Sequence, residues 1–286
     1  MGEVAGLSAD DLPAELRSSL DVPSAARVYD WFLGGAHNWR VDREFGQRVV
    51  ELLPEVKAYC RENRRFLNRA VRHALDRGVR QFVDIGSGLP TAGNVHEVVD
   101  EQRPDLRATV AYVDHEPVAH SFCDLLLQRE GTAGRHRALR ADLLDDPDGL
   151  WQRLLELGAV DPDEPVCLLI VSVLHFAKDH DEPHAAVAAL RERLPAGSLL
   201  ALSHWTTSDV DEAGAEVNRR LVEYYERTSN PGQLRSREEI RAFFGDFALE
   251  EPGLVYTPSW RPDGTEEFAD DPARSRILAA VGRKDR

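Results

Sequence analysis

Cysteine is scarce in this sequence, with three residues in a chain of 286. Cys60, Cys123 and Cys167 are far apart among apolar neighbours, and none has a second Cys or a His at the spacing of a zinc site. The pattern therefore predicts neither a disulfide framework nor a metal site. We expect all three cysteines to be small core residues.

Long apolar runs are also missing. No stretch approaches the ~18 residues that a membrane-spanning helix requires. The first residues, MGEVAGLSADDLP, lack the basic and apolar segments of a secretory leader. We expect a cytoplasmic protein without a membrane partner.

Positive charge is in deficit. The chain has 35 Lys and Arg against 50 Asp and Glu, a net charge of −15. Because nucleic-acid binding depends on clustered positive charge, the balance argues against such a partner. One arginine-rich segment, RENRRFLNRAVRH, stands out, and we interpret it as the solvated face of a helix.

The order of predicted elements divides the chain into three parts. Residues 1–22 show no sustained periodicity and are predicted to form a flexible tail. Residues 23–78 are predicted to be helical: a helix over 24–33 with Ser24 as its N-cap, a second ending near Pro54, and a third over 55–77 with Gly78 as its C-terminal cap. Residues 79–286 form the main domain.

That domain alternates apolar strands with amphipathic helices. Strands are predicted over 79–86, 108–113, 136–140, 165–173 and 198–203, with helices over 93–101, 117–130, 146–157 and 182–193. The alternation indicates an α/β fold with a parallel sheet covered on both faces. A last helix begins at the capping box of Ser236 and Glu239. Two strands near 247–256 and 275–282 have no helix between them, which favours an antiparallel pair at one edge.

A glycine-rich turn ends the first strand, in the stretch QFVDIGSGLP. Gly86, Ser87 and Gly88 fall where the backbone of such a fold approaches a ligand. A dinucleotide fingerprint requires a third glycine where Thr91 stands. A nicotinamide-dependent reductase is therefore a disfavoured alternative.

Three acids occur at the ends of three successive strands. Asp84 precedes the glycine turn, where a carboxylate repels phosphate but binds an ammonium group. Asp114 ends the second strand and is placed to accept hydrogen bonds from both hydroxyls of a ribose. Asp142 and the backbone N–H of Leu143 follow the third strand and can reach an adenine edge. S-adenosylmethionine carries all three groups without a phosphate; alternatively, Asp114 and Asp142 are helix N-caps.

The chain resembles the class I S-adenosylmethionine-dependent methyltransferases. More closely, it is similar to a bacterial S-adenosyl methyltransferase family in the blocks ARVYDWFLGGAHNWRVDREF, ENRRFLNRAVRHALDRGVRQFVDIGSGLPTAGNVHEV, and YVDHEPVAH with RADLLDDP. The resemblance implies a Rossmann-like seven-stranded sheet, mostly parallel with an antiparallel last strand. It also implies that S-adenosylmethionine is the cofactor and S-adenosylhomocysteine the product. The acceptor of the methyl group is largely unassigned in that family.

Further cofactor residues are expected around this core. Ser172 lies at the end of the predicted fourth strand. His115 stands where similar proteins often have Asn or Asp, a departure that concerns only the contact with the adenine side. In the N-terminal block, Tyr29, Gly35 and Asn38, with Gly34 and Asp42 nearby, are expected to fold over the cofactor as a lid, although a polar stretch between helices can also be a plain loop.

The methyl acceptor is expected beyond the fourth and fifth strands. His175 is the candidate catalytic base, with a packing role as the alternative. Trp31, Trp39, His204 and Trp205 are candidates for an acceptor pocket. The segment VSVLHF stands where enzymes that methylate amino groups of nucleic-acid bases carry an Asn-Pro-Pro-Tyr type motif, so we expect a small-molecule acceptor with an O or N nucleophile. A protein that binds S-adenosylmethionine as a sensor or scaffold without transferring methyl is the alternative. The sequence predicts no oligomeric state.

Overall fold

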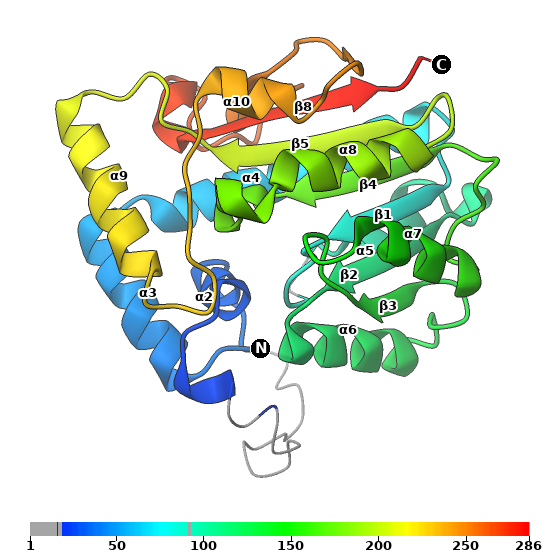
Figure 1. Ribbon diagram of the computed structural model, residues 1–286, viewed down its shortest axis with the longest axis horizontal. Coiled ribbons are helices and arrows are strands. Elements are labelled where there is room, and N and C mark those ends of the chain that lie inside the picture. The colour runs from blue at the N-terminus through cyan, green and yellow to red at the C-terminus, as the bar shows by residue number, and fades with distance from the viewer. Residues whose placement is uncertain (1–15, 17–18, 91–92, 286) are drawn as a thin grey trace.

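The computed structural model describes residues 16, 19–90 and 93–285. At its centre is an eight-stranded sheet (Figure 1). Its strand order is β3-β2-β1-β4-β5-β8-β6, and β7 also pairs with β8. The strands are β1 (Gln81–Ile85), β2 (Thr109–Asp114), β3 (Arg137–Arg140), β4 (Val166–Val171), β5 (Leu199–Trp205), β6 (Ala248–Leu249), β7 (Val255–Tyr256) and β8 (Ile277–Arg283).

The first five strands are parallel, and the last three are antiparallel to their neighbours as predicted. β8 lies between β5 and β6 and is antiparallel to both. The sheet has eight strands instead of seven because residues 247–256 form two short strands. Pro252, which has no N–H, and Gly253, with a φ of +88°, interrupt the pairing there.

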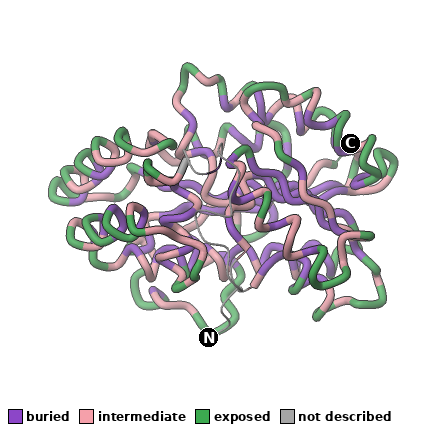
Figure 2. Tube along the Cα trace, turned by 90° about the horizontal axis from the view of Figure 1, so that it is seen from below, coloured by how far each residue is buried: buried purple, intermediate pink, exposed green. Residues whose placement is uncertain are grey.

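Helices cover both faces of the sheet. Side chains alternate along each strand, so Phe82 belongs to the apolar cluster that includes residues of α4, α5 and α6, while Val83 belongs to the cluster that includes residues of α7, α8 and α10. Figure 2 shows the buried residues gathered along these strands and the helix faces against them. The helices of these two layers are α4 (Val56–Asp76), α5 (Val95–Gln102), α6 (Pro117–Arg129), α7 (Pro147–Glu156), α8 (Pro183–Arg193) and α10 (Arg237–Ala242).

A third layer lies beyond the carboxyl ends of the parallel strands. There α2 (Ala25–Phe32), α3 (Arg40–Leu52) and α9 (Glu212–Tyr225) gather on one side of the molecule (Figure 1). They share an apolar cluster with the first turns of α4 and the end of β5. The sequence analysis missed α9, although Asp211 caps it by accepting from Gly214 N at 2.7 Å. The predicted tail over 1–22 falls mostly outside the described residues.

Local signals set several helix ends as expected. Gly78 ends α4 with a φ of +81°, and the box of Ser236 and Glu239 starts α10. Ser24 occupies the N-cap position of α2, but its side chain makes no capping bond. Instead, the side-chain oxygen of Asn230, distant in sequence, accepts from Ala25 N at 3.1 Å.

The arginine-rich face of α4 is not uniformly solvated, so that interpretation was wrong in part. Arg61 and Arg72 are partly exposed and form ion pairs at the surface. Arg69 is buried: its guanidinium donates to the carbonyls of Trp260 and Thr257 and pairs with Glu62 at 3.0 Å. It therefore joins α4 to the segment that precedes β8.

None of the described helices combines the length and the apolar character needed to cross a bilayer.

We expect Arg69→Met to lower the free energy of unfolding by roughly 3–5 kcal/mol, because it breaks a buried ion pair and leaves carbonyl groups without donors. Arg72→Met, which removes a partly exposed pair with Asp263, is the matched control with a loss of roughly 0–1 kcal/mol. Urea unfolding of both variants measures the difference. Equal losses would contradict the role given to Arg69.

Candidate functional site

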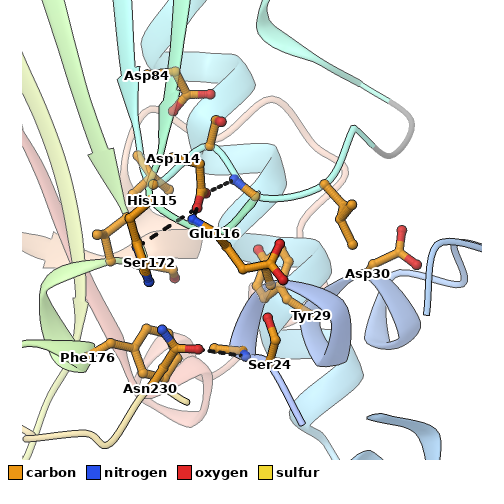
Figure 3. Close-up of a pocket in the computed structure, with 18 of the residues that line it drawn as sticks. Ser24, Tyr29, Asp30, Asp84, Asp114, His115, Glu116, Ser172, Phe176 and Asn230 are labelled. Carbon is orange, nitrogen blue, oxygen red and sulfur yellow. Dashed lines mark hydrogen bonds and ion pairs between the residues drawn. The ribbon is translucent and has the colours of Figure 1, made fainter. Parts of the chain in front are cut away.

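The carboxyl ends of β1, β2 and β4 border a cavity that encloses about 880 Å³, including the part open to solvent. β1 pairs with β2 on one side and β4 on the other, so the strand order reverses at β1. Ligands of open α/β sheets bind at such a point. Figure 3 shows the cavity with the acids of β1 and β2 facing residues of α2 and the loop after β4.

The glycine turn after β1 forms the floor of this cavity. Gly86 has a φ of +63°, and a Cβ there would come within 2.6 Å of the Val173 side chain, so only glycine fits. Gly88 has a φ of +66°, and a Cβ there would meet open space. The turn therefore presents bare backbone to a ligand.

Asp114, at the end of β2, is held by that turn and by the next helix. Its Oδ2 accepts from Gly88 N at 2.8 Å and its Oδ1 from Glu116 N at 2.9 Å. Burial raises the pKa of the Asp114 carboxyl, while these backbone bonds oppose the rise. Each carboxylate oxygen has a second lone pair for a ligand hydroxyl.

Asp84 lies deeper, on β1. Burial raises the pKa of its carboxyl to about 7; the positive charge of Arg64 opposes the shift and Asp114 adds to it. Arg64 comes from α4, and its buried Nε has no hydrogen-bond partner. With Asp30 and Glu116 also on the wall, the cavity has four acidic side chains against one arginine, which favours a cationic ligand.

Ser172, just after β4, has a backbone conformation that is unusual for a non-glycine residue, with a φ of +60°. Its N–H donates to Ser203 Oγ at 3.0 Å, and Ser203 Oγ donates to Asn63 Oδ1 at 2.6 Å. Asn63 in turn donates to the Tyr29 hydroxyl at 3.0 Å. This chain of bonds fixes β4, β5, α4 and α2 to one another around the cavity.

An ion-pair cluster holds α2 over the site. Arg27 is fully buried, and its Nε donates to Asp42 Oδ2 and one terminal nitrogen to Glu116 Oε1, both at 2.9 Å. Asp42 lies in the first turn of α3, and Glu116 caps α6. The cluster thus joins the N-terminal helices to the loop that bears Asp114.

A second cavity, of about 660 Å³ including its open part, adjoins the first. Ala25, Tyr29, Ser172 and Phe176 line both cavities. Its other walls are mainly apolar and aromatic, with His175 and Trp205 among them. Burial and the charge of Arg235 lower the pKa of the His175 imidazole to about 3, so the ring is neutral around pH 7.

Most of the predicted cofactor residues come together. Asp84, Gly86, Ser87, Gly88, Asp114, His115, Ser172 and Tyr29 all line the first cavity.

Four predicted cofactor residues do not line it. Asp142 folds back in a turn, where its Oδ1 accepts from Leu144 N at 2.9 Å, and Leu143 is buried in the core. Gly35 and Asn38 lie behind a wall residue: Asn38 donates to Asp30 Oδ2 at 2.8 Å and to the Gly35 carbonyl at 2.9 Å. They position Asp30 instead of lining the cavity.

Of the predicted acceptor residues, His175 and Trp205 line the second cavity. His204 does not, because successive strand residues face opposite ways and β5 extends through Trp205. It is buried, donating from Nδ1 to the Trp205 carbonyl at 2.7 Å, with its Nε2 3.1 Å from Arg235. Trp31 lies under Lys57, and Trp39 packs beside Phe122, so neither borders either cavity.

The sequence analysis missed Asn63, Arg64 and Asn230, which line the first cavity. For Asn63 a signal existed, because it lies between Tyr59 and Leu67 at helical spacing on the buried face of α4. Asn230 follows a helix that was not predicted, and nothing local marks it.

A family model described as S-adenosyl methyltransferase matches residues 13–285. No curated protein matches the chain. A solved DUF574 family protein from Streptomyces avermitilis is 32% identical over 93% of this chain and 99% of its own, with a TM-score of 0.84. A protein from Thermobifida fusca, provisionally assigned as a methyltransferase, is 33% identical over 96% of this chain and 98% of its own, also with a TM-score of 0.84. The fold is shared by an O-methyltransferase family protein from Burkholderia thailandensis. That protein is 17% identical over 95% of this chain and 67% of its own, with a TM-score of 0.53.

We expect Asp84→Asn to stabilise the ligand-free protein increasingly as the pH rises from about 4 to 7. A carboxyl whose pKa is raised on folding contributes stability below its unfolded pKa of 3.8 and loses that contribution as the pH passes about 7. Asparagine does not ionise, so the variant should gain roughly 2–4 kcal/mol over the wild type by pH 8.

Unfolding in urea at several pH values measures this gain. Asp148→Asn, at an exposed ion pair with Arg193, is the control and should change stability by roughly 0–1 kcal/mol. A constant difference between Asp84→Asn and the wild type across the pH range would show that Asp84 ionises normally.

Proposed function

The chain belongs to the S-adenosyl methyltransferase family, and on that basis we propose that it transfers the methyl group of S-adenosylmethionine to a small-molecule acceptor, leaving S-adenosylhomocysteine. The observation that carries this proposal is the joining of two cavities. An acidic cavity at the reversal point of the sheet shares Tyr29, Ser172 and Phe176 with an apolar cavity beside it. Cofactor and acceptor would meet at this shared wall.

The first cavity suits a ligand with positive charge and a ribose. Asp114 would accept from the ribose hydroxyls, and the turn from Gly86 to Gly88 would pass close to the cofactor. Asp84 would bind the ammonium group of the methionine part, and Arg64 its carboxylate. Asp142 and Leu143 stay candidates for the adenine edge, in the loop after β3.

The N-terminal helices are proposed as a lid over the cofactor. α2 supplies Ala25, Tyr29 and Asp30 to the first cavity, and Arg27 holds the helix down through Asp42 and Glu116. A closed site aligns the reactants and excludes water, which is most of what methyl transfer requires from a protein.

When bound, S-adenosylmethionine supplies a methyl carbon activated by a sulfonium. His175 would contact the nucleophile of the acceptor from the second cavity. Because its ring is neutral, it has a lone pair free to accept the hydrogen bond of a hydroxyl, and it can receive that proton once the oxygen becomes acidic during transfer.

Two alternatives fit less well. A sensor or scaffold that only binds the cofactor has no need of a second cavity that shares a wall with the first. A nicotinamide-dependent reductase would place a pyrophosphate on the glycine turn, where Asp84 and Asp114 would repel it. The net charge of −15 favours a small molecule over a nucleic acid as acceptor.

Calorimetric titration tests the cofactor assignment. After removal of co-purified ligand, we expect micromolar binding of S-adenosylmethionine and S-adenosylhomocysteine and no binding of NAD. Asp114→Ala should weaken S-adenosylhomocysteine binding by about 10- to 100-fold, because two charge-assisted hydrogen bonds are lost. Asp148→Ala, at the exposed pair with Arg193, should leave the affinity unchanged. Binding of NAD alone would overturn the proposal.

Arg64→Met tests the carboxylate contact. We expect it to weaken S-adenosylhomocysteine about 10- to 100-fold while leaving 5′-methylthioadenosine, which has no amino-acid part, within about twofold. Arg61→Met is the control on the same helix, since Arg61 pairs with Glu267 at the surface. An equal loss for both ligands would place Arg64 elsewhere than at the carboxylate.

A further inference from the structure

The second cavity has no ionised side chain on its described walls. Its lining contains no Asp, Glu, Lys or Arg, and the nearby Arg235 is occupied elsewhere. The guanidinium of Arg235 donates to the carbonyls of Leu174 and Ala177 and pairs with Asp179 at 2.9 Å. We propose that this cavity holds an uncharged aromatic compound with a hydroxyl group, and that this hydroxyl is the methyl acceptor. The inference rests on the proposed function.

Aromatic rings form much of the wall. The rings of Tyr59 and Trp205 meet edge to face at 6.0 Å, and those of Phe176 and Tyr225 are tilted at 5.6 Å. A planar aromatic guest matches such walls, because rings prefer edge-to-face and offset-stacked contacts with one another.

The hydroxyl groups of two wall tyrosines are already hydrogen-bonded within the protein. The Tyr29 hydroxyl donates to the Cys60 carbonyl at 3.0 Å and accepts from Asn63, while the Tyr59 hydroxyl donates to Glu55 at 3.3 Å. Burial raises the pKa of the Cys60 thiol, which is therefore neutral. Neither of these two hydroxyls has its proton free for a ligand, and the thiol carries no charge.

Two wall residues each have a buried polar atom without a hydrogen-bond partner. These atoms are the indole Nε1 of Trp205, a residue 9% exposed, and Nδ1 of His175. The indole N–H can only donate, whereas a neutral imidazole both donates and accepts. A hydroxyl group, which also does both, satisfies either atom without bringing a charge into the cavity.

A charged acceptor fits poorly. A carboxylate would need a cation, and an ammonium would need an acid, yet the described walls have neither. An uncharged hydroxyl needs neither a cation nor an acid as its partner.

The position of His175 would place the hydroxyl group of the bound compound where methyl transfer can occur. The ring centroid of His175 lies 4.4 Å from that of Phe176, which borders both cavities, so a hydroxyl bound at His175 is near the shared wall. On transfer, the hydroxyl oxygen forms a bond to the methyl carbon, and the pair of electrons in the C–S bond returns to sulfur, giving a neutral sulfide. The hydroxyl proton passes to His175 and then to water.

Three naphthalenes that share one ring system and differ in the charge of their substituent test the class of ligand. The protein is first saturated with S-adenosylhomocysteine, whose own binding is measured separately. It is then titrated with 2-naphthol, 2-naphthoic acid and 2-(aminomethyl)naphthalene. We expect 2-naphthol to bind at least 10-fold more tightly than the anion or the cation.

Two variants then test the polar contacts. We expect Trp205→Phe and His175→Phe to remove most of the preference for 2-naphthol over 2-methylnaphthalene, while S-adenosylhomocysteine binding stays within about twofold. Incubation with S-adenosylmethionine should convert 2-naphthol to its methyl ether and leave the acid and the amine unmethylated.

The outcomes separate the inference from the proposed function. If S-adenosylhomocysteine fails to bind, the proposed function fails, and this inference with it. If S-adenosylhomocysteine binds but the acid or the amine binds as well as 2-naphthol, or if the amine alone is methylated, only the inference is overturned. A preference for 2-naphthol that survives both variants would equally overturn the assignment of its hydroxyl to Trp205 and His175.

Discussion

The buried guanidinium of Arg27 is the interaction on which the arrangement of the site depends. It pairs with Asp42 of α3 and Glu116 of α6, and Glu116 donates its backbone N–H to Asp114. Because two carboxylates hold one guanidinium of α2, the rotation of α2 about its own axis is fixed. That rotation directs Tyr29 and Asp30 into the first cavity, so one buried charge places residues of the N-terminal helices against residues of the sheet.

A second set of bonds makes the wall between the two cavities. The chain from Ser172 through Ser203 and Asn63 to Tyr29 crosses four elements that are distant in sequence. Because every member both positions a neighbour and is positioned by one, the wall behaves as a unit. An acidic cavity and an apolar cavity therefore adjoin at residues whose positions are fixed by hydrogen bonds.

The sequence alone predicted the sheet, its antiparallel last strand and the junction of Asp84, Asp114 and the glycine turn. Those predictions succeeded because strand periodicity and the carboxyl-end rule act locally. The buried arginines of α4 could not be told from the exposed ones, since Arg69 finds carbonyl partners at Trp260 and Thr257, far along the chain, and Arg64 points to a cavity that only the folded sheet creates. His204 and Trp205 were assigned together because the fifth strand was predicted to end at 203, whereas it continues through both and turns them apart.

α9 lines only one of the two cavities, and this affects which of them can change in the course of evolution. α9 gives Leu221, Val222 and Tyr225 to the second cavity and no residue to the described lining of the first. Mutations on this helix can reshape the apolar chamber without disturbing the acidic one. Under the proposed function, related enzymes would keep the same methyl donor while exchanging the molecule that receives the methyl group, and a designer seeking a new acceptor would begin with these three positions.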